Sequence, residues 1–115
     1  MSHIVGNTVA ITATSAPGDT IFTAGGRAGH GFLVGIYVTG DGGDLTLIHD
    51  IGSGHPNSSA GQHSIINSMI LSSIGDQILV ALVIIYGHNT DPDKITAHLD
   101  AAGTIEIVIA AEEIT

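Results

Sequence analysis

The fold of this chain is decided by the segment Phe32-Leu33-Val34-Gly35-Ile36-Tyr37-Val38-Thr39. Large apolar side chains occupy every second position from Phe32 onward, and a mixed set lies between them. Because successive side chains of a β-strand point to opposite faces, this period of two predicts a strand with one face in the core. The glycine-rich segment 40–44 is expected to reverse the chain, so that residues 45–49 return as the partner strand of a hairpin.

Similar short apolar runs, bounded by Gly, Asp, Asn and Pro, extend outward from this segment in both directions. The stretch 64–74 would also suit a short helix, but its β-branched content favours a strand. Seven to eight strands without a long helical period predict an all-β, antiparallel β-sandwich, either jelly-roll or Ig-like. The expected strands are 8–14, 20–23, 32–39, 45–49, 64–74, 77–86, 95–99 and 104–110.

The length of 115 residues fits a single sandwich domain, 1–115, with residues 1–7 and 112–115 as possible arms toward neighbouring molecules. Eleven acidic and two basic residues give a formal net charge of −9, which disfavours nucleic acid and anionic membranes as partners. Charged residues make up 11% of the chain, about half of the usual share, which indicates a surface partly covered by neighbours. Without cysteine the chain forms neither disulfides nor thiolate metal sites.

The first residues carry neither a positive n-region nor an apolar h-region, so no secretory signal peptide is expected. The longest apolar run, 78–86, has nine residues, and a membrane-spanning helix needs about 20. This run is apolar on both faces, which indicates either a central core strand or a face covered by another subunit. We favour the second interpretation, a homo-oligomer, and expect Asp at Val83 and Ile85 to disrupt its assembly.

Seven histidines are many for this length, but they are scattered, and we interpret them as polar surface residues. If a metal site exists, His49, His55 and His63 around the long polar segment 50–62 are its first candidates. Loop carboxylates can also bind calcium, but Asp is an ordinary turn residue, and we favour turn formation as their role. Those carboxylates are Asp41, Asp44, Asp91 and Asp93.

Motifs of catalysis are missing from the sequence. The segment 25–31 is glycine-rich but leads into a strand, whereas phosphate-binding loops lead into a helix N-terminus. Ser53 lies between two glycines without a G-x-S-x-G elbow, and no strand carries the histidines of a cupin-type metal enzyme. We therefore expect a chain that is not an enzyme and has no catalytic, cofactor-binding or metal-binding residues.

The segment 33–50 resembles small β-sandwich virion proteins of tailed phages. In those proteins a strand of the form L-x-G-I-x-V-T turns through Gly, Asp or Asn into L-T-L-x-D, as Leu33–Thr39 leads here into Leu45–Asp50. The resemblance implies a capsid decoration (cement) protein of the phage head, often trimeric, whose partners are its own copies and the major capsid protein. It also implies location in the virion, after assembly in the host cytoplasm.

The alternative function is a carbohydrate- or receptor-binding module, such as a fibre tip or a calcium-dependent lectin. Binding a sugar by stacking needs exposed aromatic rings, whereas all four rings of this chain lie in expected strands and are predicted to be core. A calcium-dependent lectin that uses the four loop carboxylates stays open. The virion structural role is therefore the leading hypothesis. The four rings are Phe22, Phe32, Tyr37 and Tyr86.

Overall fold

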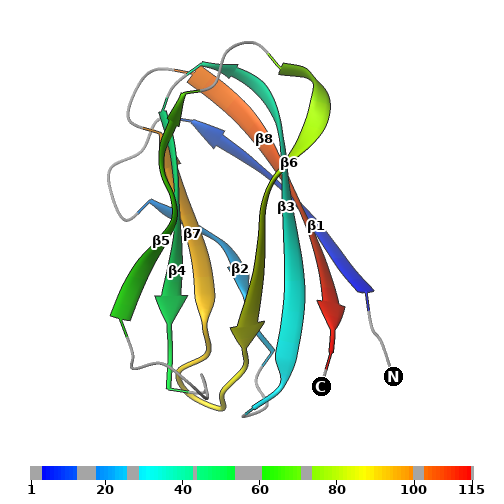
Figure 1. Ribbon diagram of the computed structural model, residues 1–115, viewed down its shortest axis with the longest axis vertical. Helices are drawn as coiled ribbons and strands as arrows, with labels where there is room; N and C mark the ends of the chain where they lie inside the picture. Colours follow the sequence, from blue (N-terminus) through cyan, green and yellow to red (C-terminus); the bar gives the residue numbers. More distant parts are fainter. Residues whose placement is uncertain are drawn as a thin grey trace.

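The structure is a computed structural model that contains eight strands arranged as two facing four-stranded sheets (Figure 1). It describes residues 4–12, 18–25, 29–42, 44–53, 61–70, 74–99 and 103–114. None of these residues forms a helix that could cross a membrane. The strands are β1 (Ile4–Thr12), β2 (Asp19–Thr23), β3 (Gly31–Gly42), β4 (Asp44–Ile51), β5 (Gly61–Ile70), β6 (Ile74–Tyr86), β7 (Lys94–Leu99) and β8 (Gly103–Glu113).

The order of the strands identifies the topology. The first sheet runs β1-β8-β3-β6 and the second β2-β7-β4-β5, with every neighbouring pair antiparallel. Only β4 and β5 follow each other within one sheet, while all other consecutive strands cross between the sheets. Eight strands wound in this way form a jelly-roll, whereas an Ig-like sandwich would pair its first two strands. The predicted antiparallel β-sandwich is therefore confirmed.

The core lies between the two sheets and follows the predicted period of two. Val34, Ile36 and Val38 of β3 are fully buried, and so are Leu45 and Leu47 of β4 in the opposite sheet. Burying such side chains contributes about 25 cal/mol per Å² of apolar surface, which is the main stabilisation of a sandwich without disulfides. The other strands add buried side chains at alternate positions: Ile21, Ile85, Ile95, Ala97, Leu99, Ile105, Ile107, Ile109 and Ala111.

The predicted hairpin between residues 32–39 and 45–49 is wrong. β3 pairs with β6 and β8, whereas β4 pairs with β5 and β7 in the other sheet. A period of two determines which side chains face the core, but it does not determine which sheet a strand joins. Both strands present an apolar inner face, and these faces meet across the core instead of lying side by side.

Several strand boundaries differ from their predictions. The stretch 64–74 is a strand up to Ile70, as favoured, and β6 starts at Ile74. The ends of the long polar segment 50–62 belong to β4 and β5, and its residues 54–60 lie outside the described part of the chain.

Both ends of the chain take part in the first sheet. Ile4 is paired with Glu112 at one end of the β1–β8 ladder, and Thr12 with Thr104 at the other. Residues 4–7 and 112–113, which were among the possible arms, are therefore bound within a sheet. Residues 1–3 and 115 lie outside the described part of the chain.

Gly40 allows β3 to bend where its pairing with β6 changes register. Its φ is +128°, and a Cβ there would lie 2.6 Å from the Thr104 carbonyl oxygen. Gly29 is a matched control, because its φ is +76° and a Cβ would meet nothing within 4 Å.

We expect Gly29→Ala to lower the free energy of unfolding by about 1 kcal/mol, the cost of a left-handed backbone alone. Gly40→Ala adds a clash with the backbone of β8 and should lower it by more than about 2 kcal/mol. Urea unfolding of both variants measures the difference. If both variants lost the same unfolding free energy, the close approach of β3 to β8 at Gly40 would not contribute to the cost of the substitution.

Candidate functional site

The outer face of the first sheet carries the candidate site. Leu33, Gly35 and Tyr37 alternate with the core residues of β3 and therefore point away from the core. β3 lies between β6 and β8, so each of these residues is the centre of a row across three strands. The rows are Ile84–Leu33–Glu112, Leu82–Gly35–Ala110 and Leu79–Tyr37–Val108.

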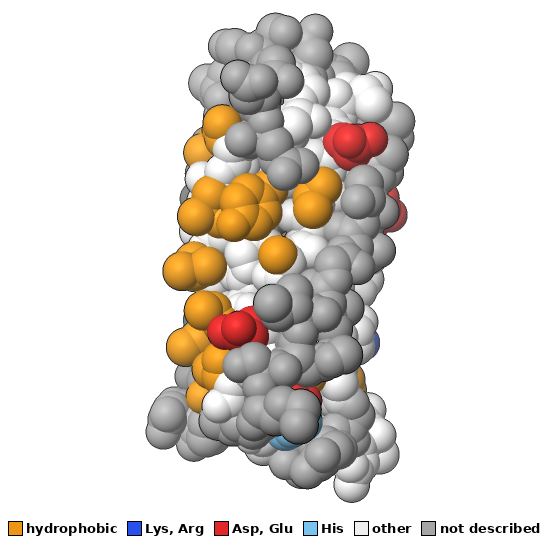
Figure 2. Space-filling view, turned by 90° about the vertical axis from the view of Figure 1, so that its right-hand side faces the viewer, with side chains coloured by type: hydrophobic (Ala, Val, Ile, Leu, Met, Phe, Trp, Pro, Cys, Tyr) orange, Lys and Arg blue, Asp and Glu red, His pale blue; other side chains and the backbone are white. Residues whose placement is uncertain are grey.

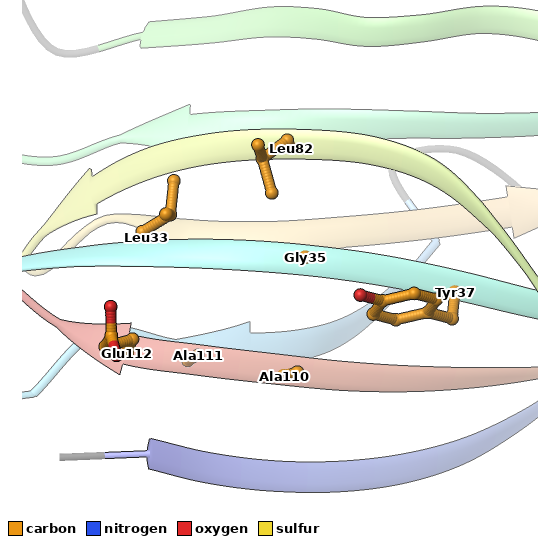
Figure 3. Close-up of a pocket in the computed structure, with 7 residues that line it drawn as sticks. All are labelled: Leu33, Gly35, Tyr37, Leu82, Ala110, Ala111 and Glu112. Atoms are coloured by element: carbon orange, nitrogen blue, oxygen red, sulfur yellow. The ribbon is translucent and has the colours of Figure 1, made fainter.

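The small residues of the middle row leave a hollow of about 190 Å³ in this face (Figure 3). A Cβ on Gly35 would lie 3.3 Å from Cε1 of Tyr37, so the missing side chain leaves room for this ring. Tyr37 and Glu112 lie at opposite ends of the hollow, and Leu33 and Leu82 lie along one side. We call this feature the Gly35 hollow, lined by Leu33, Gly35, Tyr37, Leu82, Ala110, Ala111 and Glu112.

Beside the hollow, β6 forms the edge of the sheet and exposes large apolar side chains. Figure 2 shows hydrophobic side chains gathered on this side of the molecule. An edge strand of 13 residues offers unpaired backbone groups next to this apolar surface, which is the usual setting for pairing with another chain. We call the exposed residues the β6 ridge: Ile78 at 42%, Leu79 at 51%, Leu82 at 61% and Ile84 at 43% exposure.

The face of this strand that was expected to be covered by another subunit, with Val83 and Ile85, faces the core. Ile85 is fully buried and Val83 packs against the core, so Asp at these positions would disrupt the fold itself. The pairing with β3 also shifts, because Ile36 is opposite Ala81 while the next residue, Tyr37, is opposite Leu79. This bulge breaks the alternation of apolar residues and brings Leu79 to the outer face together with Leu82. β6 is an edge strand, so its apolar outer face is not explained by a central place in the core.

At one end of the sandwich, a fully buried carboxylate joins the two sheets. Oδ2 of Asp93 lies 2.8 Å from Nε2 of His49 in β4 and accepts the backbone N–H of Tyr86 in β6 at 3.0 Å. Oδ1 accepts the backbone N–H of Gly52 at 2.8 Å. These bonds offset the cost of burying the carboxylate, and we call this cluster the Asp93 hub.

A second carboxylate fixes the neighbouring loop. Asp91 accepts hydrogen bonds from the backbone N–H and the hydroxyl of Ser53, at 3.1 and 2.8 Å. A Cβ on Gly52 would lie 2.0 Å from the carbonyl oxygen of Asp91, so this close approach requires glycine. Asp91 and Asp93 therefore hold the loop that follows β6 against the end of β4. The hydrogen bonds to Asp93 and its complete burial leave it unsuited to the alternative of a calcium site.

The three histidines that were candidates for a metal site, should one exist, are brought together only in part. His49 and His63 are opposite each other in the β4–β5 pair, but His49 contacts Asp93 and His63 is exposed. His55 lies outside the described residues. In the part of the chain that the structure describes, no group of three His, Cys, Asp or Glu residues is arranged to hold a metal ion. The interpretation of all histidines as surface residues is wrong for His49 and His98, which are 7% and 6% exposed.

Serine, histidine and aspartate come close together at the Asp93 hub, but not in the order of a hydrolase. The Ser53 hydroxyl donates to Asp91, whereas the His49 imidazole contacts Asp93. In a catalytic triad the hydroxyl is bonded to the imidazole, which takes its proton. The observed bonds instead link one loop and two sheets, which is a structural arrangement.

The predicted core placement of the aromatic rings is correct for Phe32, which is buried, and Phe22 packs against the core. It is wrong for Tyr37, which lines the Gly35 hollow on the outer face. Gly35 explains this exception, because a residue without a side chain leaves space for a ring above the sheet. Asp44 begins β4, and the side chain of Asp41 lies outside the described part of the structure.

No protein-family model matches the sequence, and no curated protein matches it. Among solved structures, a chain in the structure of infectious bursal disease virus, Gx strain, is similar with a TM-score of 0.53 and 14% identity. The match covers 98% of this chain and 32% of that one, so the chain spans about one third of that protein's length. At this identity the likeness shows a shared fold, and it extends to a virus that is not a tailed phage.

Two further structures match with lower TM-scores. One belongs to Bacillus endospore appendages, described as disulfide-linked pili, with a TM-score of 0.45, 20% identity, and coverage of 98% of this chain and 89% of that one. The other is the T13 particle of infectious bursal disease virus, with a TM-score of 0.42, 13% identity, and coverage of 97% and 35%. The present chain contains no cysteine and therefore forms no disulfide links.

The Asp93 hub gives a test of how the sheets are held together. We expect Asp93→Ala to lower the free energy of unfolding by about 3–5 kcal/mol, because it leaves His49 and two backbone N–H groups without their acceptor. Asp91→Ala, at an exposed carboxylate two residues away, should cost no more than about 1 kcal/mol. Urea unfolding measures both, and similar losses would contradict a special role of the buried carboxylate.

Proposed function

We propose that this chain is a non-enzymatic structural subunit of a virus particle, a homo-oligomeric decoration (cement) protein on the head of a phage. The observation that carries the proposal is the β6 ridge, which lies on the open edge of the first sheet. In an isolated molecule, an exposed apolar edge strand of this length promotes aggregation. In an assembly, the same strand can form a contact between subunits. Its partners in this proposal are other copies of the chain and the shell of the particle.

Charge restricts where two copies can meet. The chain has a net charge of −9, which opposes self-association. The four ridge residues carry no charge, so a contact there brings no carboxylates of the ridge against each other and relies on apolar burial. Each copy adds buried apolar area at about 25 cal/mol per Å², a contribution that is repeated around a shell.

The comparison with infectious bursal disease virus supports the proposal at the level of fold. A jelly-roll in the structure of a virus is compatible with a role in building a particle, and this chain has that fold. Folds host many functions, so the role of this chain is argued from its surface.

The alternative, a carbohydrate- or receptor-binding module, is favoured by one observation, the placement of Tyr37 on the outer face beside the Gly35 hollow. One ring gives a small platform for a sugar. This function does not require self-association, so the mass of the protein in solution distinguishes the two candidates.

We expect light scattering to give a homo-oligomer, with the mass of three 11.6 kDa chains for the favoured trimer. A monomer at micromolar concentration would contradict the homo-oligomeric proposal and favour the binding module. An oligomer with a different number of chains would support self-association and contradict only the trimer.

The ridge itself is tested by Leu79→Asp combined with Ile84→Asp. Two carboxylates within an apolar contact would be buried without partners, so we expect the oligomer to dissociate into folded monomers. The matched control is Gln62→Asp with Ser64→Asp, two exposed positions on β5, the edge strand of the second sheet. The control should keep the oligomer, and an unchanged mass in the ridge variant would overturn the proposed contact.

Metal removal provides a separate check. We expect the mass to stay the same after treatment with a chelator, because the proposed contact is apolar. Dissociation by the chelator would instead assign the assembly to a metal site, with His55 and His63 as the first residues to replace.

A further inference from the structure

We infer that the Gly35 hollow receives an arginine side chain from a different protein, the subunit on which this chain is mounted. The inference rests on the proposed function, since it names the chemistry of the partner at the same sheet. Leu82 belongs both to the β6 ridge and to the lining of the hollow, so contact along β6 would cover one side of the hollow. The rest of the lining lies on β3 and β8, away from that edge. The guanidinium would bind the Glu112 carboxylate while the aliphatic stem crosses the middle row.

The shape and lining of the hollow suit a long side chain with an apolar stem. Its walls and floor are formed mainly by Leu33, Leu82, Gly35 and Ala110, which offer no hydrogen bond to a polar ligand through their side chains. Arginine buries its methylene groups along apolar surface of this kind and keeps its charged end at the rim. The volume of about 190 Å³ is sufficient for one side chain.

The charge at one end of the hollow favours a cation. Glu112 is half-buried, and within the described part of the chain neither ion pair includes it. Its neighbour Glu113 forms an ion pair with His30, in which Oε2 of Glu113 lies 3.0 Å from Nδ1 of the imidazole. Tyr37 at the opposite end lies beside the path of the aliphatic stem, and the guanidinium can bind the Glu112 carboxylate in bidentate fashion. This bidentate bond favours arginine over lysine.

The charge of the whole chain indicates that the partner is a different protein. The chain contains only two cationic side chains, Arg27 and Lys94, against eleven acidic ones. A second copy would therefore present mainly carboxylates to a face that already carries Glu106 and Glu112. A basic surface is complementary to it, and its approach would be accelerated by the net charge of −9.

The test uses small probes that separate the stem from the charge. Amide shifts of the ¹⁵N-labelled protein are followed by NMR during titration with n-butylguanidinium, n-pentylammonium, 1-pentanol and guanidinium. Saturable shifts are expected at Gly35, Ala110 and Ala111, strongest with n-butylguanidinium. The uncharged alcohol and the stemless cation should each bind at least about fivefold more weakly, the loss expected of one partly exposed ion pair or of a short apolar stem.

Two variants divide the contributions. Glu112→Gln removes the charge and keeps the shape, so binding of n-butylguanidinium should weaken about fivefold while that of 1-pentanol stays the same. Glu106→Gln is the matched control on the same strand and should have no effect. Ala110→Leu fills an exposed position of the hollow and should abolish binding of both probes with the charge intact. The unchanged shifts of the second sheet report that each variant is folded.

Three outcomes would overturn the inference. Absence of saturable shifts would show that the hollow binds none of the probes. Equal binding of 1-pentanol and n-butylguanidinium would show that the hollow is an apolar surface without preference for a cation. Tighter binding of n-pentylammonium would assign lysine in place of arginine. A monomer in light scattering contradicts the proposed oligomer but leaves these titrations readable, so the two failures can be distinguished.

Discussion

The whole structure depends on one constraint, that each sheet must bury its apolar inner face against the other sheet. In β3 and β4 this is achieved because the chain crosses the sandwich between them, so that Val34, Ile36 and Leu47 meet in one core. Six of the seven connections make such a crossing, and only β4 and β5 form a hairpin.

The sequence was sufficient to predict local structure and insufficient for long-range pairing. The alternation in 32–39 identified both the strand and its inner side chains, because burial acts directly on single residues. The choice of partner strand depends on the balance of all eight strands, so the expected hairpin with 45–49 was wrong. The outer face of β6 was also not predictable, because a bulge opposite Ile36 and Tyr37 changes which side chains point outward, and no residue type in the sequence indicates this bulge.

A signal for the Asp93 hub was present in the sequence. The period of two places His49 on the same face as Leu45 and Leu47, and an imidazole in the core needs a polar partner. The partner is Asp93, 44 residues further along the chain, and no spacing rule connects the two positions. The Gly35 hollow was still harder to predict from the sequence, because it depends on the register that brings Leu82 and Ala110 beside Gly35.

The antiparallel pairing of β1 with β8 has a mechanical consequence. Ile4 is opposite Glu112, so the two ends of the ladder nearest the chain termini lie side by side, as the N and C labels in Figure 1 indicate. A force that separates the termini would peel the ladder one pair at a time, from Ile4 and Glu112 toward Thr12 and Thr104, instead of shearing all its hydrogen bonds together. The molecule is therefore expected to resist little force when it is pulled by its ends.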